Sequence, residues 1–287
     1  MPDAKLAFMA SLGYAQQPAA DVLASLKKLG YHGVEWTMSH FNPRTKSQQE
    51  LRQLVEQTRD AGLEVSEVCV QQDLITLDGA ARQDRIALEL ECIEAAAAAD
   101  VHVLNFFTGP APWNPAAPKI PNDISEGAAW DMLLDAFDRL VPAAEKAGVH
   151  IAVEGVWGML CHDFYTTRPL MDHYDSPHLG VNFDPSHDIL VGNFHSGWIA
   201  RQWGDLIKHM HLKDAVGVAE PGKFLFPLLG EGRVDWKGLF AALDEIGYDG
   251  FMSVEFESFT YYNTVLRGDV EEAARLSKMQ IERLLEL

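Results

Sequence analysis

Apolar positions along the chain switch repeatedly between two spacings. Segment 18–29 carries valine and leucine at the three-and-four spacing of an amphipathic helix, and it stops at Gly30. The short apolar run 32–39 follows directly. A glycine at a helix end suits a left-handed C-cap, and a mostly apolar run after it is typical of a buried parallel strand. The pattern therefore predicts a chain in which helices and strands alternate.

This helix-strand unit recurs along the whole chain. The expected strands cover residues 6–13, 32–39, 63–70, 101–107, 149–155, 179–184, 207–214 and 251–257. Each strand but the last is joined to the next by a helical segment, and a final helix is expected over about 270–285. Eight such units in 287 residues favour an α/β fold of the closed (β/α)₈ TIM barrel type over a doubly wound sheet. Since no linker or shift in composition divides the chain, we expect a single domain over residues 1–287.

Two connections are longer than a normal loop between a strand and a helix. Residues 108–122 contain five prolines, and residues 215–234 form the second long segment. On a barrel both would leave the carboxyl end of a strand, which is the face that carries active sites.

Four polar side chains stand at the ends of consecutive expected strands. They are Glu154, Asp184, His211 and Glu255, one on each of strands five to eight. Taken singly, a glutamate at a strand end is usually a solvated rim residue, and a histidine is more often a hydrogen-bonded structural residue. Their conjunction predicts an oxygen-rich site for one divalent cation. The donor set suits Mn²⁺, Mg²⁺, Co²⁺ or Zn²⁺. We expect Mn²⁺ as the bound ion.

Net charge limits the classes of binding partner that we expect, and cysteine content indicates the redox conditions of the compartment. The formal net charge is −19, and no basic patch stands out, so neither nucleic acid nor an anionic membrane is expected as a partner. Three cysteines without a Cys-x-x-Cys pair argue against a disulfide framework. The amino terminus lacks a signal-peptide pattern, and no run of 18 apolar residues occurs, so a cytoplasmic location is expected. The sequence leaves homo-oligomerisation open.

Several motifs together resemble the xylose-isomerase-like TIM barrels. They are the run 30–36 (Gly-Tyr-His-Gly-Val-Glu-Trp), the Glu154 strand, the runs 184–187 (Asp-Pro-Ser-His), 211–214 (His-Leu-Lys-Asp) and 229–236, and Glu255. The superfamily includes sugar-phosphate isomerase/epimerase-type proteins, ketose 3-epimerases and inosose dehydratase and isomerase. The resemblance covers nearly the whole chain in order. It implies that Glu154, Asp184, His211 and Glu255 hold one divalent metal, with His187 beside it contacting the substrate.

The chemistry expected of such a site is proton transfer next to a carbonyl. A divalent cation that chelates a carbonyl and the neighbouring hydroxyl stabilises the enediolate formed when the carbon between them loses its proton. The resemblance to ketose 3-epimerases implies that Glu154 and Glu255 act as the acid/base pair from opposite faces. His187 is expected to donate to the carbonyl oxygen, and Lys213 to hold a substrate hydroxyl or acid group.

For several other side chains, the sequence is compatible with either a structural or a substrate-binding role. Glu35 is expected either on the barrel floor or in a substrate subsite, and His209 in a buried hydrogen-bonded role. Trp113 is expected to stack on the apolar face of a sugar, as are Phe107, Trp157 and Tyr165, although aromatic residues in such loops equally often pack as a lid. The basic cluster of a dedicated sugar-phosphate enzyme is missing, which favours an unphosphorylated sugar, keto-sugar or polyol.

The leading prediction is a metal-dependent isomerase or epimerase of a small carbohydrate. A dehydratase acting on an inosose or keto-sugar at the same site is the alternative. A non-catalytic sugar-binding protein and an endonuclease IV-like nuclease rank below both. The nuclease pattern needs additional histidines at other strand ends, where Cys69 and Phe107 stand instead.

Overall fold

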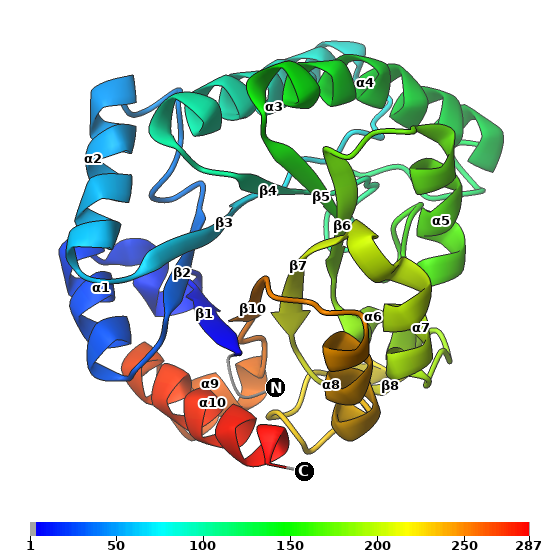
Figure 1. Cartoon of the computed structure of the whole chain (residues 1–287). Coiled ribbons are helices and arrows are strands. Elements are labelled where there is room, and N and C mark those ends of the chain that lie inside the picture. Colours follow the sequence, from blue (N-terminus) through cyan, green and yellow to red (C-terminus); the bar gives the residue numbers. More distant parts are fainter. Residues whose placement is uncertain (1–3, 287) are drawn as a thin grey trace.

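Eight parallel strands close into a barrel, as the alternating pattern predicts (Figure 1). The computed structural model describes residues 4–286, and around the barrel the strand order is β1-β10-β7-β6-β5-β4-β3-β2. The strands are β1 (Lys5–Met9), β2 (Gly33–Thr37), β3 (Glu64–Val70), β4 (Val103–Phe106), β5 (His150–Glu154), β6 (Leu179–Phe183), β7 (Ile207–Leu212) and β10 (Phe251–Val254). The predicted (β/α)₈ TIM barrel is therefore confirmed.

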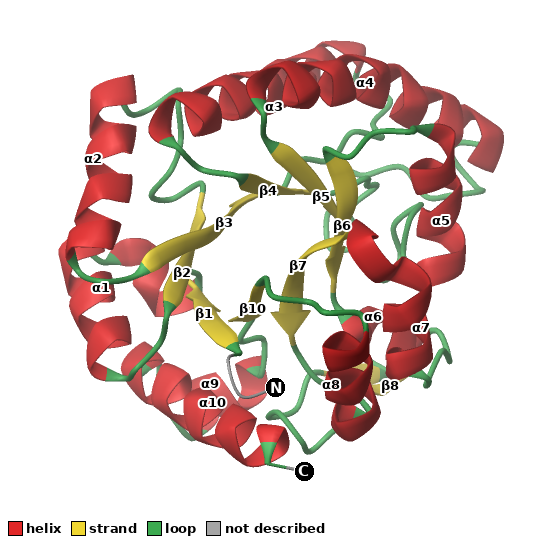
Figure 2. Ribbon diagram, in the orientation of Figure 1, coloured by secondary structure: helices red, strands yellow, loops and turns green. Residues whose placement is uncertain are grey.

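Helices form a ring around the strands, and Figure 2 shows this outer layer clearly. They are α1 (Ala19–Lys28), α2 (Gln48–Asp60), α3 (Gly79–Ala99), α4 (Glu126–Ala147), α5 (Phe164–His173), α6 (Pro185–Leu190), α7 (Ser196–Trp203), α8 (Trp236–Glu245), α9 (Phe259–Thr264) and α10 (Val270–Leu285). Two short 3₁₀ helices complete the set, η1 (Leu12–Gln16) and η2 (Gly204–Leu206). None of the helices among residues 4–286 is both long and apolar enough to cross a membrane.

Local caps begin and end the helices. Ser47 and Glu50 form a reciprocal capping box at the start of α2, which satisfies two backbone N–H groups that the helix leaves free. At the end of α4, Gly148 takes a left-handed conformation with a φ of 69°, which costs a glycine little. The chain then enters β5 two residues later, so the cap sets where this strand begins.

The first strand is shorter than the sequence predicts. Strand β1 ends at Met9, and the expected continuation to Gly13 turns into the 3₁₀ helix η1. Gly13 packs so closely against the carboxyl-terminal part of the chain that a Cβ atom there would lie 2.9 Å from the Tyr262 hydroxyl and 3.0 Å from Val270. The chain bends because η1 packs there, and apolar alternation alone does not reveal that contact.

The two long connections lie beyond the carboxyl ends of their strands. Residues 108–122 contain no helix or strand. The segment 215–234 contains a small antiparallel hairpin of β8 (Val216–Gly217) and β9 (Phe224–Leu225), which was not predicted. Strand pairing places Glu154 opposite Asn182 and His211 opposite Ser253, so these strand ends meet at similar heights in the barrel.

Candidate metal centre and its pocket

The four side chains expected at consecutive strand ends converge inside the barrel. One potential ligand atom from each of Glu154, Asp184, His211 and Glu255 lies within 4.8 Å of the others, and all four residues are buried. Glu154 ends β5, Asp184 follows β6, His211 lies in β7, and Glu255 follows β10. Four neighbouring parallel strands thus place three carboxylates and one imidazole around a common centre.

The two carboxylate oxygens of Asp184 have different contacts. The Oδ1 atom accepts a hydrogen bond of 2.8 Å from the backbone N–H of Ser186 and caps helix α6. The Oδ2 atom is buried and accepts no hydrogen bond, and the Lys213 ammonium lies 2.9 Å from it as an ion-pair partner. Cap formation therefore fixes the carboxylate and leaves its second oxygen facing the centre.

Glu154 is held by a residue that the sequence interpretation missed. Asn105 on β4 donates from Nδ2 to Glu154 Oε2 over 2.7 Å, and both residues are buried. This bond leaves Oε1 toward the centre, 3.3 Å from His211 Nδ1 and 3.6 Å from His187 Nε2. The one available signal was a polar residue in an otherwise apolar strand.

His211 is positioned from its far side by Glu35. Its Nε2 atom lies 3.1 Å from Glu35 Oε2, whereas its Nδ1 atom lies 3.3 Å from Glu255 Oε2. An imidazole whose Nε2–H is held by a carboxylate presents Nδ1 as the free nitrogen, which is the usual arrangement behind a metal-binding histidine. Glu35 is fully buried and is not among the pocket-lining residues, so the structure places it beneath the centre.

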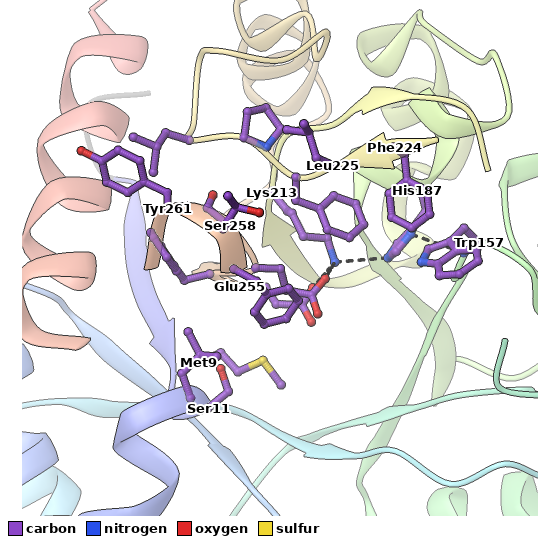
Figure 3. A pocket seen from close by; sticks show the side chains of 18 of the residues that line it. Met9, Ser11, Trp157, His187, Lys213, Phe224, Leu225, Glu255, Ser258 and Tyr261 are labelled. Atoms are coloured by element: carbon purple, nitrogen blue, oxygen red, sulfur yellow. Dashed lines mark hydrogen bonds and ion pairs between the residues drawn. The ribbon is translucent and has the colours of Figure 1, made fainter. Parts of the chain in front are cut away.

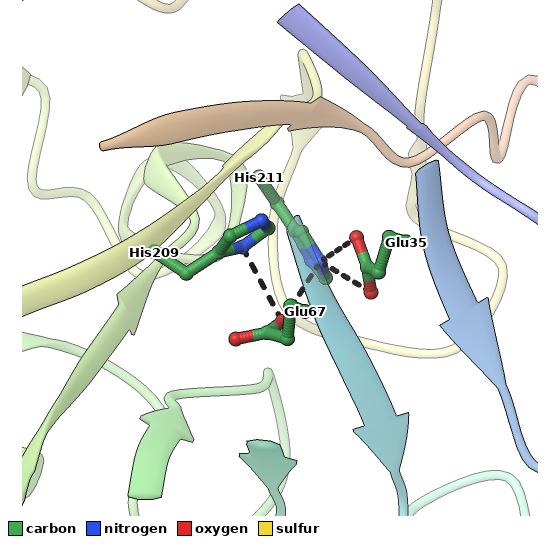
Figure 4. Close-up of side chains that lie close together, drawn as sticks. All are labelled: Glu35, Glu67, His209 and His211. Carbon is green, nitrogen blue, oxygen red and sulfur yellow. Dashed lines mark hydrogen bonds and ion pairs between the residues drawn. The ribbon is translucent and has the colours of Figure 1, made fainter. Parts of the chain in front are cut away.

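A second layer of polar residues lies deeper in the barrel (Figure 4). Glu67 Oε1 lies 3.3 Å from His209 Nδ1, which in turn lies 3.2 Å from Asn182 Oδ1. Burial, followed by the charge of Glu35, raises the pKa of Glu67 well above its ordinary value, while burial lowers the pKa of His209 to about 3. His209 is thus a neutral, buried, hydrogen-bonded residue, as the sequence predicted.

Lys213 lies against the carboxylates of the centre. Its ammonium is ion-paired with Glu255, lies 3.1 Å from Glu257 and reaches Asp184 as described above. Burial lowers the pKa of this ammonium, but Asp184, Glu255 and Glu257 outweigh burial and hold that pKa well above its ordinary value. The sequence predicts that Lys213 holds a substrate hydroxyl or acid group, and the structure adds that three acidic side chains contact its ammonium.

His187 has one ring nitrogen tied to the backbone. The N–H of Trp157 donates to His187 Nδ1 over 3.3 Å, which places the proton of a neutral ring on Nε2. Nε2 lies 3.4 Å from Asp184 Oδ2 and 3.2 Å from Lys213 Nζ. Since both Nε2–H and the ammonium are donors, the latter contact is proximity without a hydrogen bond. The ring therefore presents its Nε2–H to the centre, and its donation to a substrate carbonyl stays a prediction.

Neighbouring donors and charges lower the pKa values of Glu154 and Asp184. Burial would raise the pKa of Glu154, but His211, His187 and Lys213 outweigh it and hold this pKa well below the ordinary value. The pKa of Asp184 is lowered in the same way, since Lys213 and His187 overcome its burial. Both groups are thus present as the anions that a cation requires.

Asp214 ties down the long loop after β7. Its carboxylate accepts hydrogen bonds from the backbone N–H groups of Gly230, Gly232 and Val234 and from the Trp236 indole, all between 3.0 and 3.1 Å. A Cβ atom on Gly232 would lie 2.0 Å from Asp214 Oδ1, so only glycine fits there. In the Gly-Glu-Gly segment 230–232, the two glycine N–H groups therefore donate to Asp214 and that of Glu231 donates to the Leu228 carbonyl, so no N–H group remains for a phosphate.

A pocket of about 970 Å³ opens above the centre (Figure 3). Glu154, His187, Lys213 and Glu255 line one end of it. Phe107, Trp113 and Trp157 also line the pocket, whereas Tyr165 does not and packs instead against Phe164, with ring centroids 5.2 Å apart. Of the four aromatic residues expected to reach a substrate, three therefore face the pocket.

The donor set fits a divalent cation. It combines buried carboxylate oxygens, an imidazole nitrogen whose partner nitrogen is held by Glu35, and the Oδ2 atom of Asp184, which accepts no hydrogen bond. Mixed oxygen and nitrogen donors of this kind suit Mn²⁺, Mg²⁺, Co²⁺ or Zn²⁺ and exclude an all-thiolate structural site.

Comparisons with known proteins agree with this architecture. A family model described as xylose isomerase-like TIM barrel matches residues 23–280. Inosose dehydratase of Geobacillus thermodenitrificans (strain NG80-2) is 30% identical over 141 residues, which cover 45% of this chain and 47% of that protein. The matched part thus spans about half the length of this curated relative.

Two solved structures resemble the whole barrel. D-psicose 3-epimerase from Clostridium cellulolyticum H10, crystallised with D-tagatose, aligns with a TM-score of 0.78 and 17% identity over 98% of both chains. The IOLI protein with a bound zinc atom aligns with a TM-score of 0.76 and 19% identity, covering 98% of this chain and 97% of that one. At these identities the likeness concerns the fold. The family match over residues 23–280 shows that the chain belongs to the xylose isomerase-like TIM barrel family.

Proposed function

We propose that the protein is a divalent-metal-dependent isomerase or epimerase of an unphosphorylated sugar, keto-sugar or polyol. The observation that carries this proposal is the convergence of Glu154, Asp184, His211 and Glu255 at one end of an open pocket. The epimerase structure among the similar folds and the inosose dehydratase among the relatives support a substrate with adjacent carbonyl and hydroxyl groups.

The four converging residues would hold the ion, for which we favour Mn²⁺. When bound, the ion supplies Lewis-acid stabilisation of the negative charge that develops on substrate oxygens as a neighbouring carbon loses its proton. The remaining work falls to the chain itself. It must orient the substrate, move the proton and keep the reacting carbon away from bulk water.

Glu154 and Glu255 form the proposed acid/base pair. They leave β5 and β10, which lie on opposite sides of β6 and β7 in the barrel order, so their carboxylates approach a substrate between them from different directions. Asn105 fixes the direction of the Glu154 carboxylate, and Lys213 contacts that of Glu255. One carboxylate removes the proton and the other returns it, to the same carbon for epimerisation or to the next carbon for isomerisation.

His187 and Lys213 are the proposed donors to substrate oxygens. The Trp157 backbone contact directs the Nε2–H of His187 toward the centre, where it would donate to the substrate carbonyl oxygen as charge builds there. Lys213 lines the pocket and would exchange one of its carboxylate partners for a substrate hydroxyl.

Dehydration is the second candidate, because the matched relative is named as an inosose dehydratase. The same enediolate would then expel a hydroxyl group from the adjoining carbon. A product with new ultraviolet absorbance from an enone or enol would identify this outcome.

Proton exchange with solvent tests the proposal. The Mn²⁺-loaded protein is incubated in D₂O with a panel of ketohexoses, ketopentoses and inososes, and NMR follows deuterium in the recovered compounds. We expect deuterium at a carbon next to the carbonyl of at least one compound, and its position names the carbon attacked. Absence of exchange and of water loss throughout the panel would contradict both catalytic candidates.

A further inference from the structure

The pocket above the candidate metal centre is polar at one end and aromatic along one wall. The rings of His187 and Phe226 lie 5.9 Å apart, those of Phe226 and Phe224 5.3 Å, and those of Phe224 and Trp157 4.7 Å. Trp113 continues the row 6.5 Å from Trp157. A chain of neighbouring rings thus runs outward from the candidate catalytic histidine, and Figure 3 shows Phe224 beside His187 and Trp157.

The outer pocket also exposes large apolar side chains. Trp113, Leu225, Phe259 and Val265 are 56%, 54%, 47% and 56% exposed, and all four line this pocket. Single exposed apolar residues are common on protein surfaces and need no explanation. Their collection in one pocket, continuous with the aromatic row, indicates a surface that gains from being covered by a bound molecule.

Two further properties define that molecule. A pocket of about 970 Å³ lies at the upper end of the range for ligands of drug size, so a monosaccharide at the metal centre would leave much of it unfilled. Among the described residues, Lys213 is the only lysine or arginine that lines the pocket, and it is paired with carboxylates. A phosphate or nucleotide extension would therefore find no free cation.

We propose that the aromatic wall binds an apolar, ring-shaped extension of the substrate, so that the substrate class is an aryl-substituted sugar or polyol ketone such as an aryl keto-glycoside. The sugar portion would lie at the carboxylates and the aryl group between Phe224, Trp157 and Trp113. Aromatic rings favour offset or edge-to-face contacts with another ring, which a bare sugar cannot provide in full. This inference rests on the proposed function for the chemistry of the polar portion.

Binding of two inert glycosides tests this inference. Calorimetric titration of the Mn²⁺-loaded protein compares phenyl β-D-glucoside with methyl β-D-glucoside, which differ in the extension alone. We expect the phenyl compound to bind at least about tenfold more tightly. Phe224→Ala should reduce this ratio to about threefold or less while the methyl compound binds as before, and Trp113→Ala should also lower the ratio. Trp198→Ala is the matched control, since Trp198 is 45% exposed but does not line the pocket.

Three results would overturn the inference. One is an equal affinity for both glycosides in the wild-type protein. Another is the same loss of preference in Trp198→Ala. The third is a change of oligomeric mass in Trp113→Ala without a change in the ratio, since that would assign the wall to a subunit interface. Failure of the proposed function is read separately in the D₂O screen. A preserved preference without deuterium exchange contradicts the proposed function, whereas exchange without a preference contradicts this inference alone.

Discussion

The Nε2 atom of His211 lies 3.1 Å from the Glu35 carboxylate, and both side chains are fully buried in the barrel. Burial lowers the pKa of His211, but Glu35, Glu154 and Glu255 outweigh burial and hold that pKa well above its ordinary value. Glu35 fixes the ring so that Nδ1 faces the other three candidate ligands, and a cation that binds Nδ1 would displace the proton held there.

Replacing Glu35 by glutamine should weaken metal binding. The amide keeps the shape but no longer accepts the Nε2–H of His211 as a charged carboxylate, and the loss of such a partner typically costs about 10- to 100-fold in metal affinity. Competition with a chelator measures this affinity. Glu67→Gln is the matched control, because Glu67 is equally buried but lies 4.0 Å from His211 Nε2. Equal affinities for the wild-type protein and Glu35→Gln would contradict the assigned role of Glu35.

Removing the His187 ring should slow catalysis and leave the metal in place. A positioned donor to a developing oxyanion is typically worth roughly 3 kcal/mol, so His187→Ala should lose about 100-fold or more in rate. Metal content is measured on the same sample by plasma mass spectrometry. A variant that is less heat-stable but nearly as fast would make His187 a structural residue, and one that loses its metal would make it a ligand.

Replacing either proposed acid/base residue by its neutral amide should abolish turnover without abolishing sugar binding. Glu154→Gln and Glu255→Gln keep an oxygen ligand and remove the proton acceptor, so each should lose turnover by orders of magnitude while still binding sugar. Steady-state kinetics and calorimetric sugar titration separate the two effects. Near-normal turnover in either variant would place the base elsewhere.

Outside the centre, Glu89 on α3 is a source of pH-dependent instability. It is fully buried, neither carboxyl oxygen accepts a hydrogen bond within residues 4–286, and burial raises its pKa well above the ordinary value. Above the ordinary pKa the unfolded chain releases a proton that the folded protein retains, so this residue lowers stability as pH rises toward the raised pKa.

Glu89→Leu should therefore stabilise the protein, and more so at pH 8 than at pH 5. Removing a buried polar group without partners is worth about 1–3 kcal/mol at neutral pH. Urea unfolding at the two pH values measures the difference. Glu94→Leu on the exposed side of the same helix is the control and should change stability little. A stability gain independent of pH would point to packing alone.

The sequence predicted the barrel because each unit carries its own local signals. Apolar periodicity, helix caps and the order of elements are encoded over short segments, and parallel strands in that order close into one architecture. Once the strands were placed, the residues at their carboxyl ends were known as well. Glu154, Asp184, His211 and Glu255 could therefore be expected to lie together. Residues 6–13 failed as one strand because the bend at η1 depends on packing against Tyr262 and Val270, which lie far along the chain.

The supporting residues of the centre were less predictable for a related reason. Asn105 reaches Glu154 and Glu35 reaches His211 across the barrel interior, and such contacts depend on strand register and side-chain rotamer. The three carboxylates around Lys213 were not predicted, because counting residues along a strand shows which face a side chain is on but not which side chains from other strands meet it. The hairpin of β8 and β9 was not predicted, because each of its strands has only two residues and such a short strand shows no alternating pattern.

The central claim is that one divalent ion held by these four residues supports proton transfer next to a substrate carbonyl. The most direct measurement is metal content together with deuterium exchange, compared between the wild-type protein and Asp184→Ala. We predict one Mn²⁺ per chain and exchange into a keto-sugar for the wild-type protein, and loss of both in Asp184→Ala while the fold is retained by circular dichroism. Full metal content and undiminished exchange in Asp184→Ala would contradict the account.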